Sequence, residues 1–288
     1  MAGVRDIRRR IRAIRNMQQI TKAMKMVAAA RLRKAQDKVI AARPYANQLQ
    51  EVLARVVQAQ AGVKHPLLEK RTVQKVGYIL VTSDRGLCGG FNANLIRKTT
   101  SLLQEQTSET GLVTVGRKGR DFFRRGTVQI MAEYTGLGDS PTYAQAQEIA
   151  SEVMHLYQNG EIDEVYLMFA EFISVITNRP TLTKLLPIEK PAENNEKPVG
   201  EVKGVYLFEP SPEEILARLL PAYVENSIYR AILESKASEQ GSRMTAMSAA
   251  TDNAVDMIDR LTLIMNRARQ AVITKEISEI VGGAAALE

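Results

Sequence analysis

The carboxyl-terminal part of the chain carries a regular repeat, and this repeat limits the possible folds more than any other feature. Between residues 244 and 272, apolar or small side chains alternate in steps of three and four: Met244, Met247, Thr251, Ala254, Ile258, Leu261, Met265, Ala268 and Val272. A repeat that averages 3.5 residues is typical of a helix in a left-handed coiled coil. This segment therefore needs a second helix along its apolar stripe.

The amino-terminal segment has a matching stripe. Its members recur at intervals of three or four: Ile7, Ile11, Ile14, Met17, Thr21, Met24, Ala28, Leu32, Ala35, Val39 and Ala42. Pro44 predicts a kink, after which helical spacing resumes as far as Val57. Because each stripe is too narrow to stabilise its helix alone, we expect the two terminal helices to pair as a long antiparallel coiled coil.

The start of the second long helix is marked by its own signal. In the sequence Ser211-Pro212-Glu213-Glu214, Ser211 is suited to the N-cap, Pro212 to the first helical position and Glu214 to a capping box. From there to residue 281 only Pro221 and Gly241 would oppose a helix. At 1.5 Å per residue, roughly 70 helical residues would span about 100 Å.

Between these helices the pattern is that of an α/β domain. Residues 76–82 form a continuous β-branched and apolar run, as in a strand buried on both faces. Further strands are expected at 112–115, 128–132, 164–172, 175–186 and 205–208, and helices at 92–106, 118–124 and 143–157. This alternation predicts a mostly parallel, Rossmann-like sheet. We therefore expect an amino-terminal shaft helix at 1–60, an α/β body at 72–208 and a carboxyl-terminal shaft helix at 211–286.

Positive charge is concentrated at the amino terminus. Residues 1–38 hold twelve Lys or Arg and two Asp, although the formal net charge of the whole 288-residue chain is only +7. Such a segment favours an acidic partner, which can be nucleic acid, anionic lipid or a protein surface. The charges share their helix with an apolar stripe, and no aromatic residue in this segment is available to stack on bases. We therefore favour a protein partner and keep a basic nucleic-acid-binding protein as an alternative.

The sequence offers little support for catalysis. Cys88 is the single cysteine, which excludes an internal disulfide, and two histidines are too few for a usual zinc site. The glycine-rich loop at 83–90 leads into a helix, but it lacks a G-x-G-x-x-G or G-K-[ST] motif, and Asp84 with Arg85 places mixed charge where a phosphate would lie. We expect no catalytic residues, no cofactor and no metal, with an autonomous nucleotide-binding α/β protein as the second alternative.

Several stretches, in order along nearly the whole chain, resemble the gamma subunit family of rotary ATP synthases. They are residues 2–7 (AGVRDI), 20–29 (ITKAMKMVAA), 83–92 (SDRGLCGGFN), 247–253 (MSAATDN), 266–277 (NRARQAVITKEI) and 279–286 (EIVGGAAA). The resemblance implies a coiled-coil shaft inside a ring of three alpha and three beta subunits. It also implies an α/β body that contacts the epsilon subunit and the membrane ring of c subunits.

The function that the resemblance implies is that of a non-catalytic rotor subunit, present in one copy per complex. Proton flow would turn the c ring and this chain with it. The turning shaft would then force the three catalytic beta subunits through different affinities, which couples proton transport to ATP synthesis.

The resemblance further implies contact roles for particular residues. Beta-subunit contacts are expected at Met24, Arg243, Arg269 and Gln270. An apolar tip that turns in a sleeve is expected at Val281, Ala284, Ala285, Ala286 and Leu287. The region near the c ring and the epsilon subunit is expected at Tyr206, Leu207, Phe208 and Glu209.

The expected location is the cytoplasmic face of a bacterial plasma membrane, with membrane association only through the complex. The chloroplast type of this family carries an inserted loop with two cysteines, whereas this chain has Cys88 alone. An Arg-rich, acid-poor start also resembles a transit peptide. That interpretation is weaker, because the helical pattern continues past residue 40 with no Ser-rich stretch.

Overall fold

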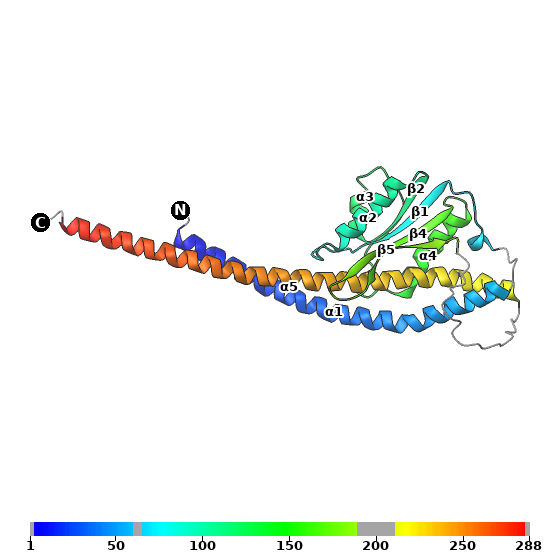
Figure 1. The fold of residues 1–288 in the computed structure, drawn as a ribbon, viewed down its shortest axis with the longest axis horizontal. Coiled ribbons are helices and arrows are strands. Elements are labelled where there is room, and N and C mark those ends of the chain that lie inside the picture. The colour runs from blue at the N-terminus through cyan, green and yellow to red at the C-terminus, as the bar shows by residue number, and fades with distance from the viewer. Residues whose placement is uncertain (1–2, 60–64, 189–210, 286–288) are drawn as a thin grey trace. The chain divides into compact units, whose positions relative to one another are not determined.

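A computed structural model describes the chain except for residues 1–2, 60–64, 189–210 and 286–288 (Figure 1). The chain divides into two compact units, which are described separately below. The smaller unit comprises Met1–Ala29 and Arg243–Glu288, and the larger comprises Ala30–Ser242. The two long helices, α1 (Val4–Ala59) and α5 (Pro212–Ala285), contribute to both units.

Both long helices are present as the sequence predicts. The backbone N–H of Glu214 donates to the Ser211 hydroxyl at 3.3 Å, which confirms Ser211 as the N-cap of α5 and Pro212 as its first residue. Helix α1 continues through Pro44, and α5 continues through Pro221. The strand expected at 205–208 lies outside the described residues.

The larger unit is built around a five-stranded sheet in the order β3-β2-β1-β4-β5. The strands are β1 (Lys75–Val81), β2 (Glu109–Val115), β3 (Gln129–Tyr134), β4 (Glu164–Phe172) and β5 (Asn178–Leu186). The first four run parallel, and β5 is antiparallel to β4. The mostly parallel sheet is therefore confirmed, and its strand order 3-2-1-4 is that of a Rossmann-like fold.

Helices cover both faces of this sheet (Figure 1). Alternate residues of β1 divide between two apolar clusters, because successive side chains of a strand point to opposite faces. Tyr78 and Leu80 pack with residues of α2 (Phe91–Glu105) and α3 (Arg117–Phe123). Ile79 and Val81 pack with residues of α4 (Tyr143–Gln158) and α5. Burial on both faces explains why the strand reads as a continuous apolar run.

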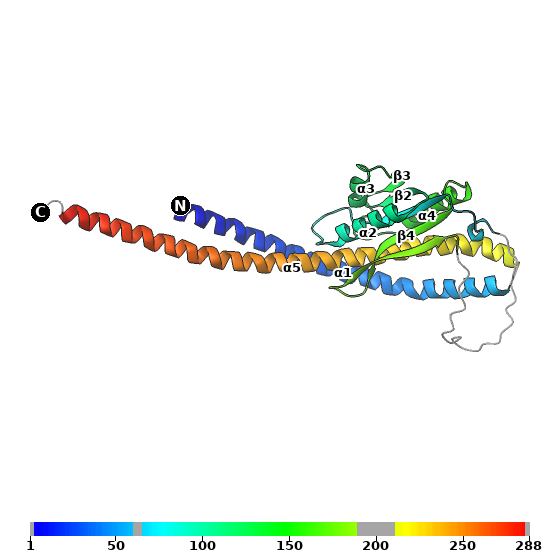
Figure 2. The same ribbon diagram turned by 45° about the horizontal axis from the view of Figure 1, so that its top comes forward.

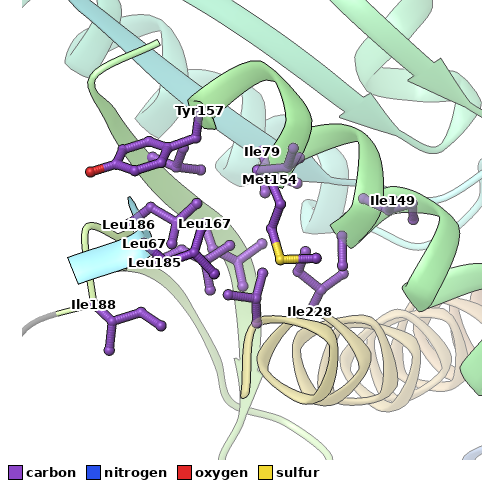
Figure 3. Packing of buried hydrophobic residues seen from close by; sticks show 14 of the residues in the cluster. Leu67, Ile79, Ile149, Met154, Tyr157, Leu167, Leu185, Leu186, Ile188 and Ile228 are labelled. Atoms are coloured by element: carbon purple, nitrogen blue, oxygen red, sulfur yellow. The ribbon is translucent and has the colours of Figure 1, made fainter. Parts of the chain in front are cut away.

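The second cluster is the larger of the two, and it includes part of α5. Figure 3 shows Ile149 and Met154 of α4 near Ile228 of α5, with Leu167 of β4 in the same cluster. The short 3-10 helix η1 (Pro66–Leu68) adds the fully buried Leu67. Burying a large apolar side chain contributes about 1.5–3 kcal/mol. Because Ile228 is fully buried in this cluster, the first part of α5 is an integral part of the α/β core.

Polar and backbone contacts also hold α5 against the sheet. The Ser235 hydroxyl accepts a bond from the Ala170 N–H at 3.0 Å, and the Ser238 hydroxyl donates to the Ala170 carbonyl at 3.1 Å. A Cβ at Gly241 would lie 3.1 Å from the Val175 carbonyl oxygen. A glycine in this helix therefore has a packing reason, since it permits close approach of the β4–β5 loop.

The smaller unit is an antiparallel pair of helices, formed by residues 4–29 of α1 and the part of α5 that begins at Arg243 (Figure 2). The Thr251 hydroxyl donates to the Thr21 hydroxyl at 2.8 Å, and the Lys25 ammonium donates to the Ser248 hydroxyl at 2.9 Å. As the residue number rises along one helix, it falls along the other, so the predicted antiparallel pairing is confirmed.

The prediction that Met17 belongs to the amino-terminal apolar stripe is wrong. Met17 is 57% exposed, whereas Gln18 is half-buried. Strict alternation of steps after Ile14 leads to Gln18 and Thr21, so the seam passes through polar residues at this point. A search for apolar side chains alone selects the methionine one position away, which faces outward.

Candidate interaction surface

The last described turns of α5 form an exposed apolar segment. Every residue from 269 to 282, named here the terminal segment, is exposed within the chain. The most exposed of its large apolar side chains is that of Ile280, at 72%. The full set is Val272, Ile273, Ile277, Ile280 and Val281. A contiguous apolar stripe of this kind on a helix marks a surface that another protein covers.

The pairing of the two helices explains where this exposure begins. Thr21 lies opposite Thr251, so Val4, the first residue of α1, is expected opposite about residue 268 in an antiparallel pair. Beyond that point α5 has no part of α1 beside it, and both views show it continuing past the start of α1 (Figure 2). The exposure of the terminal segment is thus a direct result of the unequal ends of the two helices.

The sequence of the terminal segment changes at the same place. Lys275 and Glu279 occupy the positions where the 3.5-residue seam would continue, and they form an exposed ion pair at 3.4 Å. The apolar side chains instead follow Ile273, Ile277 and Ile280, on a different line along the helix. This stripe is therefore suited to a partner other than α1.

Helix α1 adds charge and further apolar area to the surface of the smaller unit. Its exposed cationic side chains are Arg5, Arg8, Arg9, Arg10, Arg12, Arg15 and Lys22. Arg9 forms an exposed ion pair with Asp6 at 3.5 Å. Large apolar side chains are exposed beside them: Met17, Ile20, Met26 and Val27. This combination suits an acidic protein surface with apolar patches.

The carboxyl edge of the sheet, where an α/β protein would hold a nucleotide, is occupied by a carboxylate. Asp84 accepts bonds from the backbone N–H of Arg117 at 3.0 Å and of Gly136 at 3.1 Å. These two residues follow β2 and β3, so Asp84 ties together the ends of three neighbouring strands. Negative charge at this position opposes phosphate binding, which weakens the nucleotide-binding alternative.

The glycine-rich loop is held by its own side chains. The Asn92 amide donates to the Ser83 hydroxyl at 2.8 Å and to the Cys88 thiol at 3.2 Å, and the Ser83 hydroxyl donates to the Arg85 carbonyl at 2.7 Å. Cys88 is buried and packs against the α2 face of the sheet. These contacts give the motif at 83–92 a structural role, as the turn that leads from β1 into α2.

The residues with predicted contact roles differ in how exposed their side chains are. Arg269, Gln270 and Val281 lie on the terminal segment and are exposed. Met24 is half-buried, while Arg243 is buried at 8% exposure. Ala284 and Ala285 belong to α5, but their side chains are outside the described part, as are Ala286, Leu287 and the region 206–209. Among the predicted contact residues whose side chains the structure describes, those near the end of α5 are exposed, whereas Met24 is half-buried and Arg243 is buried.

Ile273, Ile277 and Ile280 form the exposed stripe but were not among the predicted contact residues. The break in the repeat at Lys275 and Glu279 was the signal in the sequence that could have located this stripe.

The contact between Tyr143 of α4 and Glu225 of α5 was also not predicted from the sequence. Burial, followed by the hydrogen bond that the Tyr143 hydroxyl donates to Glu225 at 3.0 Å, raises the pKa of Tyr143 above its ordinary value of 10.0.

The part of the chain that the structure describes contains neither a membrane-spanning helix nor a metal-binding cluster. None of its helices contains a stretch long and apolar enough to cross a bilayer. Among the same residues, no group of three or more His, Cys, Asp or Glu side chains is arranged to hold a metal ion.

The sequence is similar to known proteins along nearly its whole length. A family model described as ATP synthase matches residues 3–287. The chain is 67% identical over 288 residues to the ATP synthase gamma chain of Desulfitobacterium hafniense, with all of both chains covered. It is 59% identical over 290 residues to the ATP synthase gamma chain of Heliobacterium modesticaldum, again with complete coverage of both.

Solved structures show the same fold. A chain of the mitochondrial ATP synthase central stalk and c ring from Tetrahymena thermophila is 26% identical, with a TM-score of 0.61 over 80% of this chain and 99% of that one. A chain of the Euglena gracilis mitochondrial ATP synthase is 18% identical, with a TM-score of 0.69 over 99% and 94% of the two chains. The similarity in fold therefore extends over nearly the whole chain.

Proposed function

Because the chain belongs to the ATP synthase gamma chain family, we propose that it acts as the central-stalk rotor subunit of a proton-translocating ATP synthase. One copy would be present in each complex, with its helical pair inside a ring of three alpha and three beta subunits. The observation that carries the proposal is the terminal segment, where α5 runs on without α1 and exposes an apolar stripe.

The beta-subunit contact is proposed first at Arg269 and Gln270, which are exposed at the start of the terminal segment. A guanidinium provides five donors and an amide adds two donors and an acceptor, so this pair suits a polar loop of a partner. Met24 and Arg243 remain proposed contacts. Because Arg243 is buried in the isolated chain, its contact would require the side chain to change position.

A rotary sleeve is proposed for the end of α5, from Val281 through Ala284, Ala285, Ala286 and Leu287. Apolar contacts are non-directional, so their energy changes little as a helix turns within a matching surface. Hydrogen bonds and ion pairs depend on geometry and would favour particular angles. An apolar end is therefore suited to a rotating contact.

Coupling would work through differential contacts. The exposed sides of the two helices differ, because α1 presents mainly cations and the terminal segment mainly apolar side chains. As such a shaft turns, each of three surrounding beta subunits would meet a different face. A contact that is stronger in one conformation of a subunit shifts that subunit toward it, which is how rotation would alter nucleotide affinity.

The remaining partners are proposed from the family resemblance. The stretch 206–209 would lie near the c ring and the epsilon subunit, and membrane association would occur only through the complex. The ATP chemistry would take place on the beta subunits, so that this chain supplies no catalytic residue. The proposed location is the cytoplasmic face of a bacterial plasma membrane.

Reconstitution tests the proposal. The full chain, and a chain truncated after Val272, would each be mixed with purified alpha and beta subunits and assayed for ATP hydrolysis. We expect an active complex with the full chain and a loss of about tenfold on truncation, equivalent to about 1.4 kcal/mol of activation free energy. The double substitution R269A/Q270A should lower the rate, whereas R260A, an exposed arginine earlier on α5, should not.

Two results would overturn the proposal. If alpha and beta subunits form an equally active complex without this chain, it has no rotor role. If the isolated chain binds a nucleic acid with an affinity that falls steeply with salt, its basic helix serves the nucleic-acid alternative instead.

A further inference from the structure

A cavity of about 200 Å³ lies within the larger unit, between α1, the loop that joins β3 to α4, and α5. Four cationic side chains line it: Arg31, Lys34, Lys38 and Lys236. Asp139 is the one acidic residue in the lining. Such an excess of positive charge around a pocket creates a positive potential that attracts anions.

Only some of this charge is neutralised by neighbouring carboxylates. Arg31 pairs with Asp139 at 3.0 Å, and Lys236 pairs with the buried Glu239 at 3.0 Å. Lys34 and Lys38 have no carboxylate within ion-pair distance among the described residues. About two positive charges therefore remain at the cavity, even when Glu239 is counted.

Lys38 is held in place by neutral oxygens. Its ammonium donates to the Ser140 hydroxyl at 2.6 Å and lies 3.5 Å from the Pro141 carbonyl oxygen. These acceptors orient the ammonium without cancelling its charge, and the Ser140 hydroxyl keeps a proton that it can donate to a ligand. The side chain is thus positioned before any ligand arrives, which reduces the entropy lost on binding.

The loop places a helix terminus beside the same wall. Helix α4 begins at Tyr143, two residues after Pro141, and the positive end of its dipole favours a nearby anion. Thr142 caps the helix with its own side chain, so the dipole acts here as a supporting field. The main contacts would come from Lys34, Lys38 and the Ser140 hydroxyl.

We propose that this cavity binds a phosphate group, either as inorganic phosphate or as the terminal phosphate of a larger anion. A phosphate group carries about −1.5 to −2 charges near neutral pH, which matches the residual charge of the site. It also offers several oxygen acceptors for ammonium and hydroxyl donors. A singly charged carboxylate would leave part of the charge unbalanced.

The test uses the full chain alone, so that nucleotide sites on other subunits do not contribute. Inorganic phosphate, pyrophosphate and ADP would be titrated separately at low ionic strength, with binding followed by calorimetry and by ³¹P line broadening. We expect saturable binding that weakens with added salt. The variant K34Q/K38Q should weaken it at least tenfold, while K70Q/K98Q, which removes the same charge from exposed lysines elsewhere in the larger unit, should change it less than twofold.

Several outcomes would decide the matter. Equal loss in both double variants would show general charge attraction and overturn the site, as would the absence of binding at 50 mM phosphate. If K34Q/K38Q fails to fold, judged by circular dichroism, the single variant K34Q replaces it, because Lys34 is exposed and its loss leaves the Lys38 contacts in place. Tighter binding of ADP than of pyrophosphate would identify a nucleotide as the source of the phosphate group.

Discussion

At the residue scale, Gly116 shows how one side chain can be excluded by its surroundings. Its φ is +101°, and a Cβ added there would lie 2.2 Å from the Thr82 carbonyl oxygen. The Thr82 hydroxyl in turn accepts a bond from the Gly119 N–H at 2.9 Å, so β1 and α3 are locked together at this point. Only glycine satisfies both the backbone angle and the close approach.

The substitution Gly116→Ala should therefore destabilise the chain by about 3 kcal/mol or more, because backbone strain and a backbone clash add together. Urea unfolding at neutral pH measures the effect. Gly86→Ala is the matched control, since its Cβ would meet only the Lys118 side chain at 3.8 Å. A similar loss in both variants would contradict this account.

Tyr143 predicts a pH dependence. Its half-buried hydroxyl donates a hydrogen bond to Glu225, and partial burial together with this bond raises its pKa above 10.0 in the folded state. Above pH 10 the unfolded chain loses this proton while the folded chain keeps it, so stability falls as pH rises. Tyr143→Phe should reduce that slope by up to about 1.4 kcal/mol per pH unit, seen in urea unfolding between pH 9 and 11. An unchanged slope would show that this hydroxyl does not control alkaline stability.

At the element scale, the helical pair depends on small residues in its seam. Ala28 is buried at 1% exposure and Ala254 at 7%, which lets the two helices approach closely. Polar seam residues such as Thr21 and Thr251 bond to each other instead of relying on apolar packing. The seam therefore combines close approach with specific polar pairing, which sets the register of the pair.

Enlarging the seam should separate the helices. Ala28→Leu is expected to lower the free energy of unfolding by about 1–3 kcal/mol, because overpacking forces the helices apart. Ala23→Leu, at an exposed position of the same helix, serves as the control and should change stability by less than about 0.5 kcal/mol. Thermal melts followed by circular dichroism at 222 nm would compare them. Equal melting temperatures for the two variants would argue against close seam packing.

At the scale of the whole molecule, charge is distributed unevenly along the chain. The cations of α1 are exposed, and the exposed pair of Arg9 with Asp6 is of a kind worth roughly 0–1 kcal/mol. Their main effect should fall on the rate of association with an acidic partner, because long-range attraction steers encounter more than it adds affinity.

The triple variant R8Q/R12Q/R15Q should therefore assemble with alpha and beta subunits about tenfold more slowly at low salt, with the difference disappearing near 0.5 M salt. A control with the same change in charge, K70Q/R97Q/K98Q, removes exposed cations of the larger unit. Stopped-flow light scattering would follow assembly. A salt-independent defect in the triple variant would indicate lost packing instead of lost steering.

The sequence by itself determined the secondary structure and its pairing. The stripe at 244–272 and the cap at Ser211 depend on residues near one another in the chain, so their periodicity identifies a helix and its start directly. The same holds for the apolar run of β1, whose length and β-branched content indicate a strand buried on both faces. Helix α5 and strand β4 were accordingly located to within a residue or two.

Only the tertiary structure decided which side chains are available. It showed that Gln18 and not Met17 lies in the seam, that Arg243 is buried, and that the terminal segment is exposed. It also brought Lys38 beside Ser140, which is about a hundred positions away along the chain. The physical reason is that exposure depends on where a neighbouring helix ends and which loop packs beside it, and no local periodicity records either of these.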